Sequence, residues 1–323
     1  MTSKLLSPEE IAVRAGEQVP FLRLPPATVF SERAARLAAL AADDHPMAGF
    51  LNFIATLARA QHQSLQAGAG ATSADAAHLD AHAGEITPPY DAVHWRRQAG
   101  WHDATRALLA SVGLDGLPPA TVDAVQRVST ASDEFLDAQA DRILNHITLG
   151  LDFAAAPLIA AGLQAHWTSL VRKTEAEHGE RAFGRTVRGN LCPCCASAPV
   201  GGITRLGAEE SGYRYLQCSL CSTQWHYVRI KCTTCENTKG LHYEALSTEG
   251  EAERTARTRD VVRAECCPEC HRYLKIFSME KDPNVEPMAD DLATIALDLL
   301  VADTGLVQGG VDLMLYYGDP GDH

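Results

Sequence analysis

Four short segments with the same spacing decide the fold: Cys192-Pro193-Cys194-Cys195, Cys218-Ser219-Leu220-Cys221, Cys232-Thr233-Thr234-Cys235 and Cys267-Pro268-Glu269-Cys270. All ten cysteines of the chain lie between residues 192 and 270. Because two residues separate the outer cysteines of each segment, one backbone turn can direct both sulfurs at the same point. Two such turns that face each other form a tetrahedral cage of four thiolates. Four segments therefore predict two metal sites.

The spacing of the segments along the chain favours a sequential arrangement. The 22 residues between Cys195 and Cys218, and the 31 between Cys235 and Cys267, are enough for a hairpin. Only ten residues separate Cys221 from Cys232, about the length of one strand. An interleaved arrangement is the alternative. The expected ligands form two groups: Cys192, Cys195, Cys218 and Cys221, then Cys232, Cys235, Cys267 and Cys270.

Length and composition indicate a globular protein with more than one domain. The chain has 323 residues, of which 46% are hydrophobic and 21% charged. Its first ten residues contain no apolar run typical of a secretory signal. The longest apolar stretch, residues 153–163, is too short to span a bilayer. We therefore expect a cytoplasmic protein, where thiols stay reduced and clustered cysteines favour metal over disulfides.

The charge of the chain opposes binding to nucleic acid or to an anionic membrane. The formal net charge is −13. Residues 187–277 contain twelve Lys and Arg against ten Asp and Glu, and two divalent ions in four-thiolate cages would make this region negative. Phosphate backbones attract dense positive charge. We expect neither a nucleic-acid partner nor membrane insertion.

Residues 1–183 are predicted to form an all-α domain. Ser7, Pro8 and Glu10 are typical of a helix start. Between residues 29 and 183, apolar side chains recur at helical spacing, and breaks fall at 67–74, 88–89 and 118–119. Four stripes illustrate the pattern: Met47, Phe50, Leu51, Ile54, Leu57 and Ala58; Trp101, Ala104, Leu108, Leu109 and Val112; Leu136, Ala140, Ile143, Leu144 and Ile147; and Ile159, Leu163, Trp167, Leu170 and Val171.

Residues 184–280 are predicted to form two tandem metal ribbons, which are small β-hairpins with a cysteine turn at each end. Strands are expected at residues 213–217, 225–230, 241–246, 261–264 and 273–277. Such a module has little apolar core, and zinc ligation contributes on the order of 10–16 kcal/mol to the folding of small sites. The fold class is therefore α+β.

Residues 281–323 are expected to carry one last helix, from Asp290 to about Ala302, which docks on the rest of the protein. Leu292, Leu299 and Leu300 belong to its apolar stripe. Its narrow polar face is marked by Asp290, Asp291 and Asp298. Asp290 and Asp291 are interpreted as charges placed at a helix N-terminus.

Cys194 and Cys266 are not needed by either predicted cage. Each adjoins a predicted ligand, and we interpret both as spectator thiols; a redox or ligand-exchange role is the alternative. His226, His242 and His271 also lie near the cysteine turns, but eight cysteines already complete two sites.

Three longer stretches resemble the formate dehydrogenase accessory protein family, FdhE. They are residues 215–232 (YLQCSLCSTQWHYVRIKC) continuing through Cys235 and 237–241 (NTKGL), residues 267–270 (CPEC) with 273–275 (YLK), and residues 280–283 (EKDP) with 289–293 (ADDLA) and 296–300 (ALDLL). The resemblance implies that the eight paired cysteines form rubredoxin-like sites and favours iron as the metal. One departure leaves zinc open, because rubredoxin-type turns favour glycine after the second cysteine. Here the followers are Ala196, Ser222, Glu236 and His271.

The resemblance further implies a non-catalytic, chaperone-like maturation factor that binds the catalytic subunit of respiratory formate dehydrogenase in the cytoplasm. The sequence contains no glycine-rich phosphate loop and no serine nucleophile motif, which agrees with a non-enzyme. Two alternatives follow from the cysteine turns alone. One is a rubredoxin-like electron-transfer protein. The other is a nucleic-acid-binding zinc ribbon, which the charge opposes.

Overall fold

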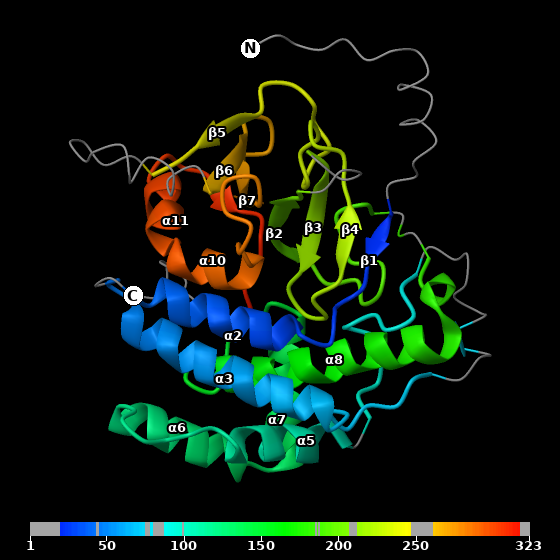
Figure 1. Cartoon of the computed structure of the whole chain (residues 1–323), viewed down its shortest axis with the longest axis vertical. Helices are drawn as coiled ribbons and strands as arrows, with labels where there is room; N and C mark the ends of the chain where they lie inside the picture. The colour runs from blue at the N-terminus through cyan, green and yellow to red at the C-terminus, as the bar shows by residue number, and fades with distance from the viewer. Residues whose placement is uncertain are drawn as a thin grey trace.

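The chain forms a helical layer and a β-sheet that lies against it (Figure 1). The structure, a computed structural model, describes residues 20–42, 45–74, 78–79, 87–98, 100–184, 186, 188–206, 212–246 and 261–316. The helix start expected at Ser7 lies outside these residues. Within them, the helical N-terminal part is followed by strands that carry the cysteine turns, which is the α+β arrangement expected from the sequence.

The helical layer is built around one long buried helix. Residues 158–171 of this helix are buried on every side, because other helices and the sheet surround it. A helix buried on all sides needs no polar face, and this stretch is accordingly apolar or small apart from Gln164 and His166. A short 3-10 turn, η1 (Glu180–Ala182), follows it. The helices of this layer are α2 (Val29–Leu40), α3 (Ala48–Gln66), α5 (Gly100–Ala110), α6 (Pro119–Ser129), α7 (Asp133–Leu144) and the central α8 (Ala156–His178).

Small residues let α5 approach α8 closely. A Cβ atom at Gly162 would lie 2.2 Å from the Thr105 hydroxyl oxygen, well inside van der Waals contact. The expected apolar stripes fall on α3, α5, α7 and α8. Ile147 differs from expectation, because α7 ends at Leu144 and leaves Ile147 in an exposed turn.

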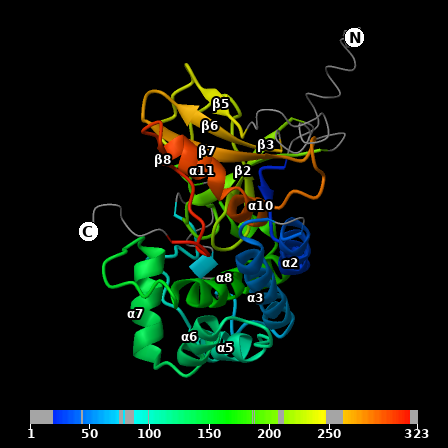
Figure 2. The ribbon, with the colours of Figure 1, turned by 90° about the vertical axis from the view of Figure 1, so that its left-hand side faces the viewer.

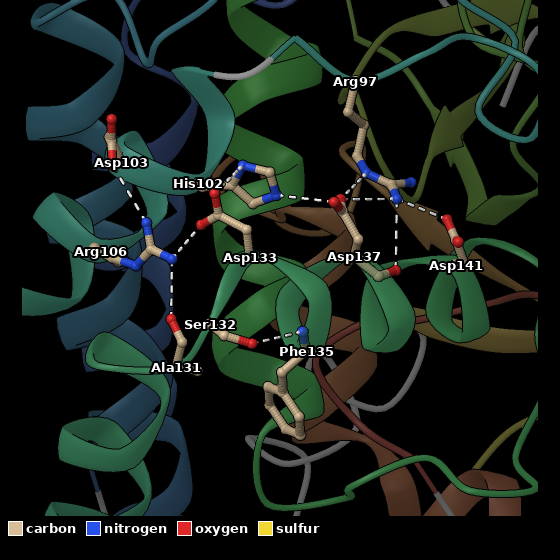
Figure 3. A network of polar contacts seen from close by, with 10 residues as sticks. All are labelled: Arg97, His102, Asp103, Arg106, Ala131, Ser132, Asp133, Phe135, Asp137 and Asp141. Carbon is tan, nitrogen blue, oxygen red and sulfur yellow. Dashed lines mark hydrogen bonds and ion pairs between the residues drawn. The ribbon is translucent and has the colours of Figure 1, made fainter.

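A network of ion pairs on the outer face joins α5 to α7 (Figure 3). Arg106 bonds to Asp133, and the Nε2 atom of His102 lies 3.1 Å from a carboxylate oxygen of Asp137. Arg97 also bonds to Asp137, at 3.1 Å. Exposed pairs of this kind contribute about 0–1 kcal/mol each. Because the network lies at the end of the molecule away from the sheet, we interpret it as a structural contact between helices.

The two ribbons share one continuous sheet, with the order β1-β4-β3-β2-β7-β6-β5. Hairpin β2–β3 continues into β4, and β5, β6 and β7 form the second antiparallel group. The parallel pair β2–β7 joins the groups, and β8 pairs with β7. The strands are β1 (Leu22–Arg23), β2 (Pro199–Thr204), β3 (Arg214–Cys218), β4 (Gln224–His226), β5 (His242–Glu244), β6 (Val262–Cys267), β7 (Arg272–Ser278) and β8 (Val307–Gln308).

Strand β2 was not expected from the sequence because it contains Gly201 and Gly202, which weaken a strand pattern. The structure explains the first glycine. A Cβ atom there would lie 2.5 Å from the Phe277 ring and 2.7 Å from the Lys275 carbonyl oxygen. Glycine in a strand often marks such a close backbone approach. The residue therefore permits the parallel contact that unites the ribbons.

The C-terminal helix differs from the single helix expected between Asp290 and Ala302. It is broken at Thr294 into α10 (Pro287–Ala293) and α11 (Ile295–Ala302). The Thr294 hydroxyl donates to the Asp290 carbonyl at 2.7 Å, and a lysine from β7 binds the Asp291 carbonyl. Both interactions take carbonyls that a continuous helix would use. Helix α10 packs between the sheet and α2 (Figure 2).

The break also changes which residues of α11 are buried. Leu297, Asp298 and Val301 are buried, whereas Leu299 and Leu300 are 61% and 58% exposed. The prediction that these two leucines lie in a buried stripe is therefore wrong. The apolar pattern of the sequence continues across Thr294, and the sequence alone does not reveal that the helix is broken there.

Candidate metal centres

The first four-cysteine group lies at the junction of the sheet and the helical layer. The Sγ–Sγ distances are 3.5 Å for Cys192 and Cys221, 3.4 Å for Cys195 and Cys218, and 3.6 Å for Cys195 and Cys221. All four side chains are buried. One cysteine turn precedes β2 and the other follows β3, so hairpin β2–β3 brings the pairs together.

The second group lies at the outer part of the second ribbon. The Sγ–Sγ distance is 3.8 Å for Cys232 and Cys270, and 3.6 Å for Cys235 and Cys267. The sulfurs of each group all lie within 4.8 Å of one another. Cys235 is exposed and Cys270 is partly exposed, unlike the ligands of the first group. The grouping in space is the sequential one.

The donor set fits a tetrahedral ion. A metal–sulfur distance of about 2.3 Å in a tetrahedral site requires sulfurs about 3.8 Å apart, close to the separations in both groups. Burial raises the pKa of the Cys192 and Cys218 thiols well above their usual range. Metal coordination reverses this effect, because a coordinating thiol is deprotonated. These eight residues could therefore hold two ions.

The residue after each second cysteine adopts a left-handed backbone conformation. Six non-glycine residues among those the structure describes have positive φ, and four of them are these followers. The strain costs roughly 1–2 kcal/mol per residue in a non-glycine residue. Each turn thus has the backbone shape that glycine usually provides, although none contains glycine there. The φ values are 59° for Ala196, 60° for Ser222, 62° for Glu236 and 55° for His271.

Backbone and hydroxyl groups surround the sulfurs of the first group. The Cys218 sulfur accepts hydrogen bonds from the backbone N–H groups of Leu220 and Cys221, both at 3.3 Å. The Cys221 thiol donates to the Thr223 hydroxyl at 3.2 Å, and that hydroxyl donates to the Cys194 sulfur. The two backbone N–H groups that donate to Cys218 favour the charged form of its sulfur. No local sequence pattern identifies Thr223, because its contacts with the cysteine sulfurs depend on the geometry of the turn.

The two remaining cysteines are buried beside the groups but belong to neither. Cys194 lies 3.5 Å from the Thr223 hydroxyl, and burial raises its pKa well above the usual range. Burial likewise raises the pKa of Cys266 to about 11. Two buried thiols with raised pKa agree with spectators. The three nearby histidines are also outside the four-sulfur groups found in the described part of the chain: His226, His242 and His271.

Helical-layer residues hold the first group in place, and sequence reasoning missed them. The backbone N–H of Tyr90 donates to the Cys194 carbonyl at 3.1 Å, and that of Ala92 donates to the Cys195 carbonyl at 2.8 Å. From α8, the Gln164 side chain donates to the Ser219 carbonyl at 2.8 Å. These contacts join residues far apart in the sequence, so no local pattern reveals them.

Buried ion pairs join α10 and α11 to α2 and the sheet. Asp290 accepts two hydrogen bonds from Arg36, at 2.6 and 2.9 Å. Lys275 lies 2.9 Å from Asp291 and 2.5 Å from Asp298. Asp290 lies in the first turn of α10 and accepts a hydrogen bond from the Glu286 backbone N–H at 2.8 Å, as expected of a helix-terminal charge. The expected polar face is wrong, because all three aspartates are buried and paired with cations from other elements.

A groove of about 810 Å³ runs between α2 and the first ribbon. Its walls come from the segment around β1, from α2 and from residues 279–287, and residues of the first ribbon line the rest. Ser222, the follower of Cys221, lines the groove, so the first group lies just beneath it. Segment 20–24 is fixed there by strand β1, which pairs with β4.

Comparison with known proteins shows to which family the chain belongs. The models of the FdhE N-terminal, central and C-terminal domains match residues 19–181, 191–229 and 230–315. The chain belongs to the FdhE family. An FdhE homolog of Serratia proteamaculans is 34% identical, covering 98% of this chain and all of that protein. One of Pseudomonas aeruginosa is 36% identical, covering 98% and 99%.

The fold is shared with a solved FdhE structure. The crystal structure of the FdhE protein from Pseudomonas aeruginosa aligns with a TM-score of 0.81 and 34% identity, covering 93% of this chain and all of that one. FdhE membership and the arrangement of helices and cysteine-bearing strands thus agree with the expectation from sequence. Among the described helices, none has the length and apolar character needed to cross a membrane.

Proposed function

We propose that this FdhE-family chain is a non-catalytic maturation factor that binds the catalytic subunit of respiratory formate dehydrogenase in the cytoplasm. The family membership supports this proposal. The observation that carries it is the combination of two four-sulfur groups with a helical layer that buries one of them. Such an arrangement provides a stable platform beside a groove rather than a reaction centre.

We further propose that all eight paired cysteines are metal ligands. Cys192, Cys195, Cys218 and Cys221 would hold one ion, and Cys232, Cys235, Cys267 and Cys270 the other. The family resemblance favours iron, and the four-sulfur geometry also suits zinc. When bound, either ion joins distant turns of the ribbon, and iron can in addition carry an electron. Four protein ligands leave no open position for substrate, which supports a non-enzyme.

The proposed organisation has three parts: a helical domain over residues 1–183, a metal-ribbon module over 184–280 and a docking segment over 281–323. The groove beside the first group lies where these parts meet, and all three contribute residues to it. We propose this groove as the surface for the catalytic subunit. Its mixed lining of apolar residues and side chains such as Gln217 and Gln224 suits a protein segment better than a small molecule.

Affinity purification tests the proposal. The tagged chain is expected to recover the catalytic subunit of formate dehydrogenase from its own host during formate respiration. Ala35 and Ala39 are exposed on α2 and line the groove, so replacing both with Trp should fill it and reduce recovery. Ala138→Trp, on the exposed face of α7, is the matched control. Wild-type protein that recovers no such subunit would refute the proposal.

Electron transfer is the second candidate, because Cys235 is exposed and could bring a second-site ion close to a redox partner. Four-thiolate iron changes by one electron, whereas zinc does not. A red protein that bleaches on reduction would support this candidate. A colourless protein containing two zinc ions would exclude it and leave the maturation role.

A further inference from the structure

The two four-cysteine groups differ in how they are joined to the rest of the protein. The four cysteines of the first group belong to the main apolar core, together with residues of α3, α5, α7 and α8. The main chain around the group is also bonded to the helical layer through Tyr90, Ala92 and Gln164. Opening this group to solvent would therefore require separation of the sheet from the helices.

The second group lies outside the apolar cores. None of its four cysteines belongs to an apolar core cluster among the described residues. Cys235 is exposed, and the turn that carries it is exposed at Thr234 and Glu236. The salt bridge beside it, between Lys231 and Glu236, is largely in solvent. Cys232 and Cys267 are buried, but water and solutes can reach the group from the side of Cys235 and Cys270 without any change in the main core.

Few contacts hold the chain that leads away from this turn. Between residues 233 and 246 the regular structure is strand β5, three exposed residues that pair only with β6. Lys239 and Gly240 are also exposed. Beyond it, the Tyr243 hydroxyl donates to Glu265 at 2.8 Å and Leu246 packs on the second apolar cluster, so residues 242–246 are held to β6. A metal ion bound by Cys232 and Cys235 would therefore be the main tether of residues 233–240 to Cys267 and Cys270. Segments with few buried contacts open at low free energy.

We propose that the second site is exchangeable: its ion can leave or be replaced while the first site and the rest of the fold stay intact. This inference rests on the proposed metal binding by both groups. Release of the ion frees residues 233–240 and loosens this surface, whereas the first ion leaves only when the sheet and helical layer separate. The protein thus has one structural ion and one that alters an exposed surface.

The rate of metal release tests directly whether one site is exchangeable and the other structural. Full-length protein loaded with Zn²⁺ is mixed with a chromogenic chelator, and zinc release is followed together with helical ellipticity. The expected result is two phases. One ion leaves with no loss of ellipticity, and the second leaves only as the helices unfold. In parallel, trypsin should cut after Lys239 in the chelator-treated protein but not in the zinc-loaded protein.

A pair of variants assigns the phases. Cys235→Ser should remove the fast phase and leave the helical melting temperature unchanged. Cys195→Ser should remove the slow phase and lower that temperature. Loss of both ions in a single phase that coincides with unfolding would overturn the division, while leaving metal binding by both groups intact. A protein that takes up no zinc or iron would instead overturn the metal assignment on which the division rests.

Discussion

Replacing Lys275 with Met should produce one of the largest losses of stability available from a single residue. The Lys275 side chain is fully buried and pairs with Asp291 and Asp298, whose side chains are 6% and 9% exposed. Burial opposes the charge of Lys275, but the two carboxylates more than compensate and raise its pKa. Methionine keeps the volume and removes the charge. Leaving buried charges uncompensated in this way costs roughly 3–5 kcal/mol.

Urea denaturation followed by tryptophan fluorescence, at fixed metal content, measures this loss. Lys231→Met is the matched control, because Lys231 is 30% exposed and its partner Glu236 is 59% exposed. It should cost no more than about 1 kcal/mol. Adding Asp291→Asn and Asp298→Asn to Lys275→Met should restore much of the stability by removing the uncompensated charges. Equal effects of the two Lys variants, or no restoration by the triple variant, would refute the reasoning.

Four other substitutions test three separate features, each by the free energy of unfolding. Gly162→Ala should destabilise the fold because its Cβ would meet Thr105. Gly49→Ala in α3 is the control: no atom lies within 4 Å of its Cβ, so it should stabilise the fold by up to about 1 kcal/mol. A change of stability in the same direction for both variants would contradict the close approach of α5 to α8. Burial lowers the pKa of His166 to about 4, below its unfolded value near 6.5, so this group's contribution to stability is present above pH 6.5 and is lost as the pH falls through 4. In His166→Gln, the loss of stability between pH 6.5 and pH 4 should be smaller by about 3 kcal/mol. An unchanged pH dependence of the free energy of unfolding would refute this prediction. Glu236→Gly should be neutral or stabilising because glycine relieves a positive φ, and a clear loss would show that the side chain matters more than the backbone.

The sequence predicted the cysteine groups because they follow from spacings between residues that are close together in the chain. A spacing of two residues constrains a turn, and the lengths between turns constrain the hairpins. The burial of Asp290 could not be read in the same way, because its partner Arg36 lies 254 residues away. The place of Asp290 in the first turn of a helix follows from the local sequence, whereas its pairing with a distant cation does not.

Similar physical reasons explain the other differences. Strand β2 was missed because Gly201 is selected by the approach of β7, a tertiary contact, against the local strand preference. The break at Thr294 depends on Lys275 reaching a helix carbonyl from the sheet. Leu299 and Leu300 then turn outward. In each case a long-range contact overrides a local pattern.

The groove beside the first cysteine group can form only late in the synthesis of the chain. Its walls come from residues 20–39 and 279–287, and the Arg36–Asp290 pair that fixes them spans 254 residues. At a synthesis rate of 5–20 residues per second, roughly 10–50 s separate these two segments on the ribosome. A nascent chain that already has its first helices therefore still lacks one wall of the groove. Only a chain translated past residue 287 can present this surface, so truncated products would not compete for whatever binds there.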